Sequence, residues 1–202
     1  MSRVDALDPA GIGAALRGQL IGNRILILEE TTSTNDVVSQ LAAGSDEGLV
    51  VFAEKQTAGR GQYGRGWESA GYRGLWLSIL LRPRIPVNDS GRLTDLLAST
   101  IAATLKEEIG LAPSIKPPND VYLDGRKIAG VLVEMRVEAT GDYAAIAGIG
   151  LNVNQLPEDF PLQLRTSAGS IAMAVGHPVD RQRLSVALLR KLDSRYNSFG
   201  AA

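Results

Sequence analysis

The chain contains no cysteine and only one histidine, His177. The lack of cysteine excludes disulfides, thiolate nucleophiles and zinc sites with cysteine ligands. A single histidine cannot build a multi-histidine metal site, and a histidine-based catalytic triad would have to use His177. His177 stands in the sequence GHP, which is typical of a turn, so we expect it to be an ordinary turn residue. Any chemistry must therefore be carried by other groups.

Long apolar runs and an excess of charge are missing as well. No apolar stretch approaches the roughly 20 residues that cross a bilayer, and the N-terminus lacks a signal-peptide pattern, so we expect a cytoplasmic protein that binds no membrane. The formal net charge of −1 gives no overall field that would attract nucleic acid. With 45% apolar and 21% charged residues, the 202-residue chain has the composition of a globular protein with one substantial core.

Hydrophobic periodicity and turn residues predict the order of helices and strands. The turn Asp124-Gly125 is typical of a β-hairpin, which favours antiparallel pairing of its flanking strands. The order as a whole predicts an α+β fold, with a mixed, largely antiparallel sheet and helices packed on one face. We expect helices in residues 9–20, 31–44, 90–109 and 179–196, and strands in residues 23–30, 47–55, 74–83, 114–123, 126–137 and 143–154.

Between two of these strands lies a glycine-rich stretch, residues 57–74, which we expect to be a long functional loop. Gly59, Gly61 and Gly64 match the pattern GxGxxG, but a dinucleotide-binding turn should open directly into a helix, and here a strand follows. Arg60 and Arg65 lie among these glycines. Their guanidinium groups suit carboxylate and phosphate oxygens, although a solvated basic loop is the simpler alternative.

Four stretches together resemble the biotin protein ligase family, in that family's order and spacing. They are STN at 33–35, AEKQTAGRGQYGRGW at 53–67, KPPNDVYLDGRKIAGVLVE at 116–134 and GIGLNVN at 148–154. The resemblance implies a class II synthetase-like catalytic domain that joins biotin to the α-phosphate of ATP and releases pyrophosphate. The biotinyl group then passes from biotinyl-5′-AMP to one lysine of a biotin carboxyl carrier protein, or of the carrier domain of a biotin-dependent carboxylase.

The resemblance also assigns roles to individual residues. Lys127 and Arg60 are the expected catalytic residues, and Asp120 is the expected ligand of Mg²⁺. The expected biotin-binding residues are Ser33, Thr34, Asn35, Gln56, Arg60, Gly61, Gln62, Lys127, Gly130 and Gly148. The expected nucleotide-binding residues are Arg65, Trp67, Asn119, Asp120, Gly150 and Asn152.

The sequence departs from the family pattern at two positions. Gln62 stands where the family usually has a second loop arginine, so closure over the adenylate is expected to be looser. Pro117 stands where the family has a tryptophan, which removes an aromatic contact and a backbone donor. We expect one catalytic domain over residues 1–202, with neither an N-terminal helix-turn-helix domain nor the family's small C-terminal β domain, hence no DNA binding. Analogy with the family also allows a homodimer through an exposed sheet edge.

Two other functions remain open at this point. The first is a lipoate or octanoate ligase or transferase, whose carrier chemistry is similar. The second is a non-catalytic module that holds biotin or its adenylate, a possibility raised by Gln62 and Pro117. The STN triplet and the GRGxxGRxW pattern of the loop favour biotin over lipoate, and the presence of Lys127 and Arg60 favours an enzyme.

Overall fold

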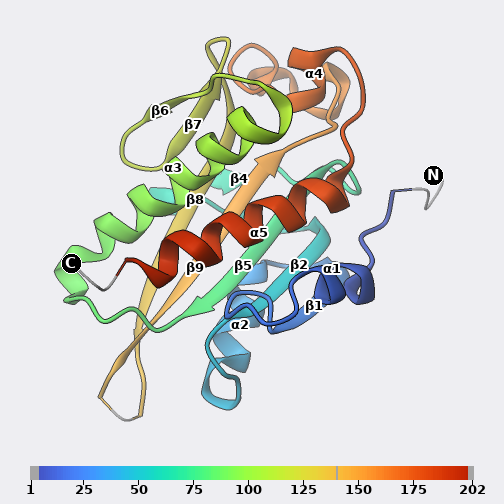
Figure 1. Cartoon of the computed structure of the whole chain (residues 1–202). Helices are drawn as coiled ribbons and strands as arrows, with labels where there is room; N and C mark the ends of the chain where they lie inside the picture. The colour runs from blue at the N-terminus through green and yellow to red at the C-terminus, as the bar shows by residue number, and fades with distance from the viewer. Residues whose placement is uncertain (1–4, 140, 200–202) are drawn as a thin grey trace.

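A seven-stranded sheet forms the centre of the molecule (Figure 1). The computed structural model describes residues 5–139 and 141–199. In spatial order the strands are β1 (Arg24–Thr31), β2 (Leu49–Gln56), β5 (Gly74–Leu81), β9 (Tyr143–Asn152), β8 (Arg126–Val137), β7 (Asp120–Leu123) and β6 (Ser114–Lys116). β1 pairs with β2 in parallel, and the other neighbours pair antiparallel. The predicted α+β class and the mixed, largely antiparallel sheet are therefore confirmed.

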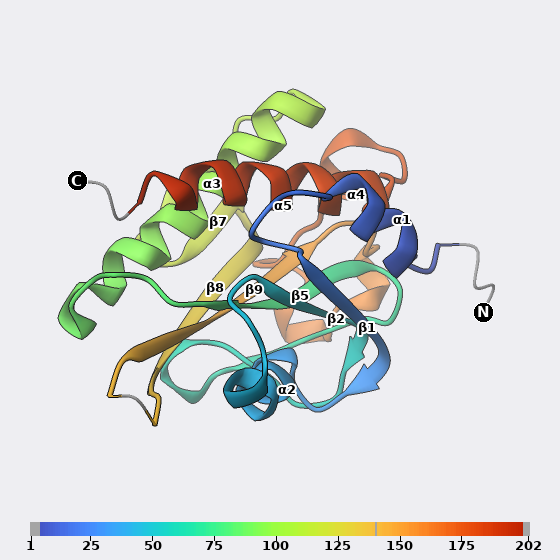
Figure 2. The same cartoon turned by 60° about the horizontal axis from the view of Figure 1, so that its bottom comes forward.

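Helices cover the two faces of this sheet unequally. The long helices α3 (Ser90–Ile109) and α5 (Arg181–Asn197) lie on one face together with α1 (Pro9–Ala15), as expected (Figure 2). The short helix α2 (Thr34–Leu41) lies on the opposite face. Alternation along β2 explains this arrangement, because Phe52 packs into the core under the long helices, while Val51 packs with Val38 of α2.

Local sequence signals set the ends of several elements. The Asp180 side chain accepts a hydrogen bond from the amide of Arg183 and so caps α5, at the start of the predicted helix. α3 ends at Gly110, which has a left-handed φ of 79°. Asp124 and Gly125, with φ values of 50° and 74°, form the predicted turn between β7 and β8. His177 is exposed, in agreement with its assignment to a turn.

The glycine-rich stretch is more ordered than the predicted loop. β3 (Gly59–Arg60) and β4 (Gly66–Trp67) pair antiparallel, and a 3₁₀ turn, Gln62–Gly64, joins them. Tyr63 at the tip has a positive φ of 59° and is 86% exposed. The stretch is therefore a small hairpin, which fixes Arg60 and Trp67 at its base.

The segment that follows β9 was not predicted in detail. It contains 3₁₀ turns at Pro157–Asp159 and Leu162–Leu164 and the short helix α4 (Ile171–Val175). The amide of Lys127 donates to the carbonyl of Ser167, and the amide of Gly169 donates to the carbonyl of Lys127. This pairing fixes the start of β8 against the segment. Within the described part of the chain, no helix has the length and apolarity that a membrane crossing requires.

Candidate functional site

A narrow cleft lies on the face of the sheet that carries α2. Its empty space is about 420 Å³, counting the part open to solvent. The predicted site residues that line it are Ser33, Thr34, Asn35, Gln56, Arg60, Gly61, Trp67, Asn119, Lys127, Gly130, Gly148 and Gly150. Leu77, Val131, Leu132 and Ile149 complete the lining. The structure thus brings together residues from all four motifs.

Hydrogen-bonding side chains form one end of the cleft, at the start of α2. The amide and the hydroxyl of Thr34 both donate to Gln56 Oε1, at 2.8 and 3.1 Å. Thr34 Oγ1 also lies 2.7 Å from Ser78 Oγ, which in turn donates to Asn35 Oδ1 at 2.5 Å. Ser33 precedes the helix as its N-cap, but its side chain makes no capping bond. Ser78 is fully buried in β5 among these polar groups, and no sequence pattern indicated its role.

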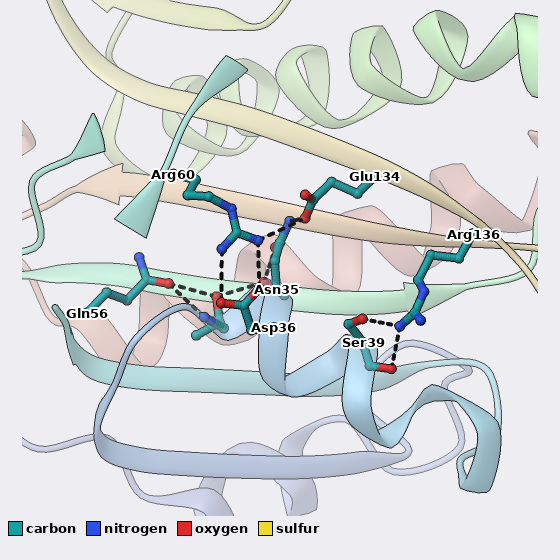
Figure 3. Close-up of polar contacts among 9 residues, drawn as sticks. Asn35, Asp36, Ser39, Gln56, Arg60, Glu134 and Arg136 are labelled. Carbon is teal, nitrogen blue, oxygen red and sulfur yellow. Dashed lines mark hydrogen bonds and ion pairs between the residues drawn. The ribbon is translucent and has the colours of Figure 1, made fainter. Parts of the chain in front are cut away.

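Arg60 lies between two carboxylates (Figure 3). Its Nη1 donates to Asp36 Oδ2 at 2.9 Å and its Nη2 to Asp36 Oδ1 at 2.7 Å. Glu134 Oε2 lies 3.5 Å from the same Nη2 and accepts a hydrogen bond of 2.5 Å from Asn35 Nδ2. Hydrogen bonds from Arg60 hold the pKa of the Asp36 carboxyl below its ordinary value, and the same pair raises the pKa of Arg60. Sequence reasoning missed both carboxylates, although Asp36 directly follows the STN motif.

Side chains of the site explain three of the glycines in the sheet, Gly130, Gly148 and Gly150. A Cβ at Gly150 would lie 2.5 Å from Trp67 Cε2, and one at Gly130 would lie 3.0 Å from Trp67 Cζ3. A Cβ at Gly148 would lie 2.4 Å from Asn35 Oδ1. These distances are shorter than van der Waals contact, so the glycines leave room for the indole and the amide.

Lys127 is held by its neighbours on two sides. Its Nζ lies 2.6 Å from Asp120 Oδ1 and 5.3 Å from the centre of the Trp67 ring. The ammonium group of Lys127 thus forms an ion pair with Asp120, the residue predicted to bind Mg²⁺. In the described ranges, no three histidine, aspartate or glutamate side chains come together as a metal site. A magnesium ion here would have to take most of its ligands from phosphate and water.

A second cavity adjoins the first and shares Trp67 and Lys127 with it. Its empty space is about 600 Å³. The predicted residue Asn152 belongs here, and its amide donates to the carbonyl of Gly169 at 2.9 Å. The rest of the lining was not predicted and consists of Gly66, Glu68, Tyr122, Phe160, Leu164, Ser167 and Ala168. Trp67 and Lys127 therefore stand where a ligand in one cavity would meet a ligand in the other.

Three predicted residues lie outside the lining of both cavities. Gln62 and Arg65 lie toward the tip of the β3–β4 hairpin, and Arg65 is exposed. Asp120 contacts the site through Lys127. Asn119 lines the first cavity, but its amide is also bonded to the carbonyl of Val131 at 2.9 Å. The backbone thus supports Asn119, whereas the two hairpin residues line neither cavity.

Comparison with known proteins gives the chain its family. The chain is 36% identical to the bifunctional ligase/repressor BirA of Bacillus subtilis over 96% of its own length, and it spans 60% of that relative. It is 34% identical to the biotin--[acetyl-CoA-carboxylase] ligase of Mycobacterium tuberculosis, covering 96% of this chain and 74% of the relative.

Solved structures support the same assignment. The biotin protein ligase of Aquifex aeolicus, solved in complex with biotin and ATP, superposes with a TM-score of 0.77 at 30% identity. The match covers 88% of this chain and 72% of that one. Residues 27–154 match the biotin/lipoate A/B protein ligase family. This range contains the four motifs and all the residues that line the first cavity. The chain belongs to the biotin/lipoate A/B protein ligase family.

Proposed function

We propose that this chain activates biotin with ATP and transfers the biotinyl group to a lysine of a biotin carboxyl carrier protein. The observation that carries the proposal is the pair of adjoining cavities that meet at Trp67 and Lys127. One cavity would take biotin and the other the nucleotide, so that the two reacting groups come together beside the lysine. The names of the similar ligases, together with the biotin and ATP of the Aquifex complex, support this choice of substrates.

The polar end of the first cavity favours biotin over lipoate or octanoate. Hydroxyl and amide groups of Ser33, Thr34, Asn35 and Gln56 lie there, and they match the donors and acceptors of a ureido ring. These groups bond to one another and to Ser78 and Glu134. A ureido ring can exchange hydrogen bonds with them, whereas an alkyl chain or a dithiolane ring offers no group for such an exchange. Biotin would therefore enter with its ring at the start of α2 and its carboxylate toward Arg60 and Lys127.

The first chemical step needs positioning and charge neutralisation. A carboxylate oxygen of biotin attacks the α-phosphorus of ATP, and the bond from that phosphorus to the bridging oxygen of pyrophosphate breaks. Pyrophosphate leaves with the bonding electron pair. Lys127 would stabilise the negative charge on the α-phosphate, and Arg60 would hold the attacking carboxylate. No protein nucleophile is required, in agreement with a chain that lacks cysteine.

In the second step the neutral amine of the carrier lysine attacks the acyl carbon of biotinyl-AMP. The bond from that carbon to the phosphate oxygen breaks, AMP leaves, and the amine gives up a proton as the amide forms. Trp67 would pack against the nucleotide during both steps, since its indole borders both cavities. ATP would enter as its magnesium complex. We propose Asp120 as the protein ligand of the metal, which requires that the incoming phosphates draw Lys127 away from it.

The test is a reaction of the protein with ATP, Mg²⁺ and biotin, with AMP and carrier labelling measured by mass spectrometry. We expect AMP formation and a carrier that gains one biotinyl group. Labelling by lipoate or octanoate instead would overturn the choice of substrate, and biotin binding without AMP would overturn the assignment of an enzyme.

The site assignment has its own test in Lys127→Met. We expect this variant to lose at least about 100-fold in kcat, because a positioned charge at the phosphate is removed. Lys106→Met serves as the control, since Lys106 lies in the last turn of α3, away from the cleft. Full adenylation by Lys127→Met would contradict the role given to Lys127.

A further inference from the structure

Each cation of the cleft is already paired with a carboxylate. Lys127 lies 2.6 Å from Asp120. Arg60 donates hydrogen bonds from both terminal nitrogens to Asp36, and Glu134 Oε2 lies 3.5 Å from one of these nitrogens (Figure 3). These two cations thus face three carboxylates before any ligand enters. An anionic ligand meets a site whose positive charge is fully compensated.

The contact from Asp36 occupies the part of Arg60 that a ligand carboxylate would use. A guanidinium presents its two terminal N–H groups as a planar fork that matches one carboxylate in bidentate fashion. Asp36 takes both positions of this fork, with distances of 2.7 and 2.9 Å. Asp36 itself does not line the cleft, whereas Arg60 does. Asp36 therefore acts on the cleft through Arg60.

Both partners are partly open to water, so the pair can separate at modest cost. The side chains of Arg60 and Asp36 are each 38% exposed. Exposed ion pairs of this kind contribute little to stability, because water and salt compensate the separated charges. Glu134 stays beside Arg60 after such a separation, since it is also bonded to Asn35.

We propose that Asp36 is a positioning residue that competes with the carboxylate of biotin for Arg60, and so weakens the binding of ligands that carry a negative charge at that end. This inference rests on the proposed function. Binding of biotin exchanges one carboxylate for another on the same guanidinium, and the Asp36 side chain turns to water. Arg60 is thereby kept oriented and neutralised until the ligand replaces Asp36.

A purely structural role for Asp36 predicts the opposite outcome. If Asp36 only held Arg60 in place for the ligand, its removal would leave Arg60 disordered and would weaken binding. If it competes, its removal would strengthen the binding of biotin and leave an uncharged analogue unaffected. Biotinamide, in which a neutral amide replaces the carboxylate, has the same ring and chain and therefore separates the two possibilities.

The experiment is calorimetric titration of the whole chain and of Asp36→Asn with biotin and with biotinamide, without ATP. We expect Asp36→Asn to bind biotin roughly two- to five-fold more tightly than the parent, in keeping with the small free energy of an exposed pair, and to bind biotinamide equally well. Asp36→Glu should behave like the parent. Glu30→Gln is the matched control, because Glu30 forms an exposed pair with Lys55, neither residue lines the cleft, and the variant should bind both ligands unchanged.

Unchanged or weaker biotin binding by Asp36→Asn overturns the inference, and so does an equal gain for both ligands. If thermal unfolding shows that Asp36→Asn is poorly folded, Asp36→Ser provides the same comparison, because serine is well tolerated near a helix N-terminus. If the parent chain does not bind biotin at all, the proposed function itself fails, which is a different result from a parent that binds biotin and an Asp36→Asn that gains nothing.

Discussion

Trp67 shows how one residue can link the two cavities. Its indole packs over Gly130 and Gly150 and meets Trp76 edge to face, with ring centroids 6.2 Å apart. The indole N–H is buried and makes no hydrogen bond to another described group. The Lys127 ammonium lies 5.3 Å from the Trp67 ring centre. A ligand in either cavity would thus contact a ring whose position depends on glycines in the sheet.

The first prediction follows from the contact of Trp67 with Gly150. In Gly150→Ala the new methyl carbon would lie 2.5 Å from Trp67 Cε2, so the indole must move away from the sheet. We expect kcat/KM for adenylate formation to fall roughly ten- to a hundred-fold, because a displacement of about 1 Å at a reacting site has effects of this size. The rate of pyrophosphate release at a series of substrate concentrations measures this kcat/KM.

Gly91→Ala is the control for this variant. A Cβ at Gly91, in the first turn of α3, has no neighbour within 4 Å. We expect it to retain full activity and to be slightly more stable, because alanine favours the helix. If Gly150→Ala were as active as Gly91→Ala, the position of the indole would not matter for catalysis.

At the scale of single elements, short-range signals predicted the fold well. The Asp124-Gly125 turn, the cap by Asp180 and the stop at Gly110 depend on neighbours within a few residues, so the sequence displays them directly. The β3–β4 hairpin was missed, because its strands have only two residues each and glycine disfavours strands. The cavity walls formed by Phe160 and Leu164 were missed, because no periodic pattern marks an irregular segment.

The β8–β9 hairpin gives a second prediction, which concerns pH. Arg82, next to the end of β5, donates from Nε and Nη2 to the two oxygens of Glu138, at 2.8 and 2.7 Å. It also donates to the carbonyls of Ser45 and Ala42. The hydrogen bonds from Arg82 to Glu138, together with the charge of Arg82, lower the pKa of the Glu138 carboxyl below its ordinary value of 4.5. A lowered pKa means that the stabilisation is complete above about pH 4.5 and is lost as the pH falls through the lower folded value.

Glu138→Gln should therefore lower the free energy of unfolding by about 0.5–1 kcal/mol at pH 7. The deficit should shrink below pH 4.5, because Glu138 of the unfolded parent takes up a proton there while the folded carboxyl is still charged, and the ion pair then contributes less to stability. Urea unfolding at a series of pH values measures both effects. A deficit that stayed constant down to the acid unfolding of the parent would contradict an electrostatic origin.

Across the whole molecule, the features that the sequence could not predict are the long-range ones. The order of the sheet places β5 between β2 and β9, and no local pattern encodes such pairing. The same limit applies to the site. The motifs identified Thr34 and Asn35, but Ser78 and Glu134 reach them from strands 44 and 99 residues away in sequence. Contacts of this kind depend on the assembled fold.

The last prediction concerns a buried ion pair that connects distant segments of the molecule. Arg181 at the start of α5 is fully buried and donates to Glu54 of β2 at 2.5 Å, to the carbonyl of Gly74 at 3.0 Å and to that of Asp5 at 2.6 Å. Glu54 accepts a further bond from the amide of Leu7. The pair thus joins the N-terminal segment, two strands and the last helix.

Glu54→Gln leaves the Arg181 charge buried without its carboxylate, so we expect it to lower the free energy of unfolding by about 3 kcal/mol. The double variant Glu54→Leu with Arg181→Met removes both charges, and its loss should be smaller than the sum of the two single losses. Urea denaturation gives these values, provided that the dependence on urea is the same for all variants. Glu30→Gln, with both partners about half exposed, should change stability by less than about 0.5 kcal/mol. A loss for Glu54→Gln as small as that of Glu30→Gln would mean that water reaches Arg181 in solution, and that the pair does not hold the four segments together.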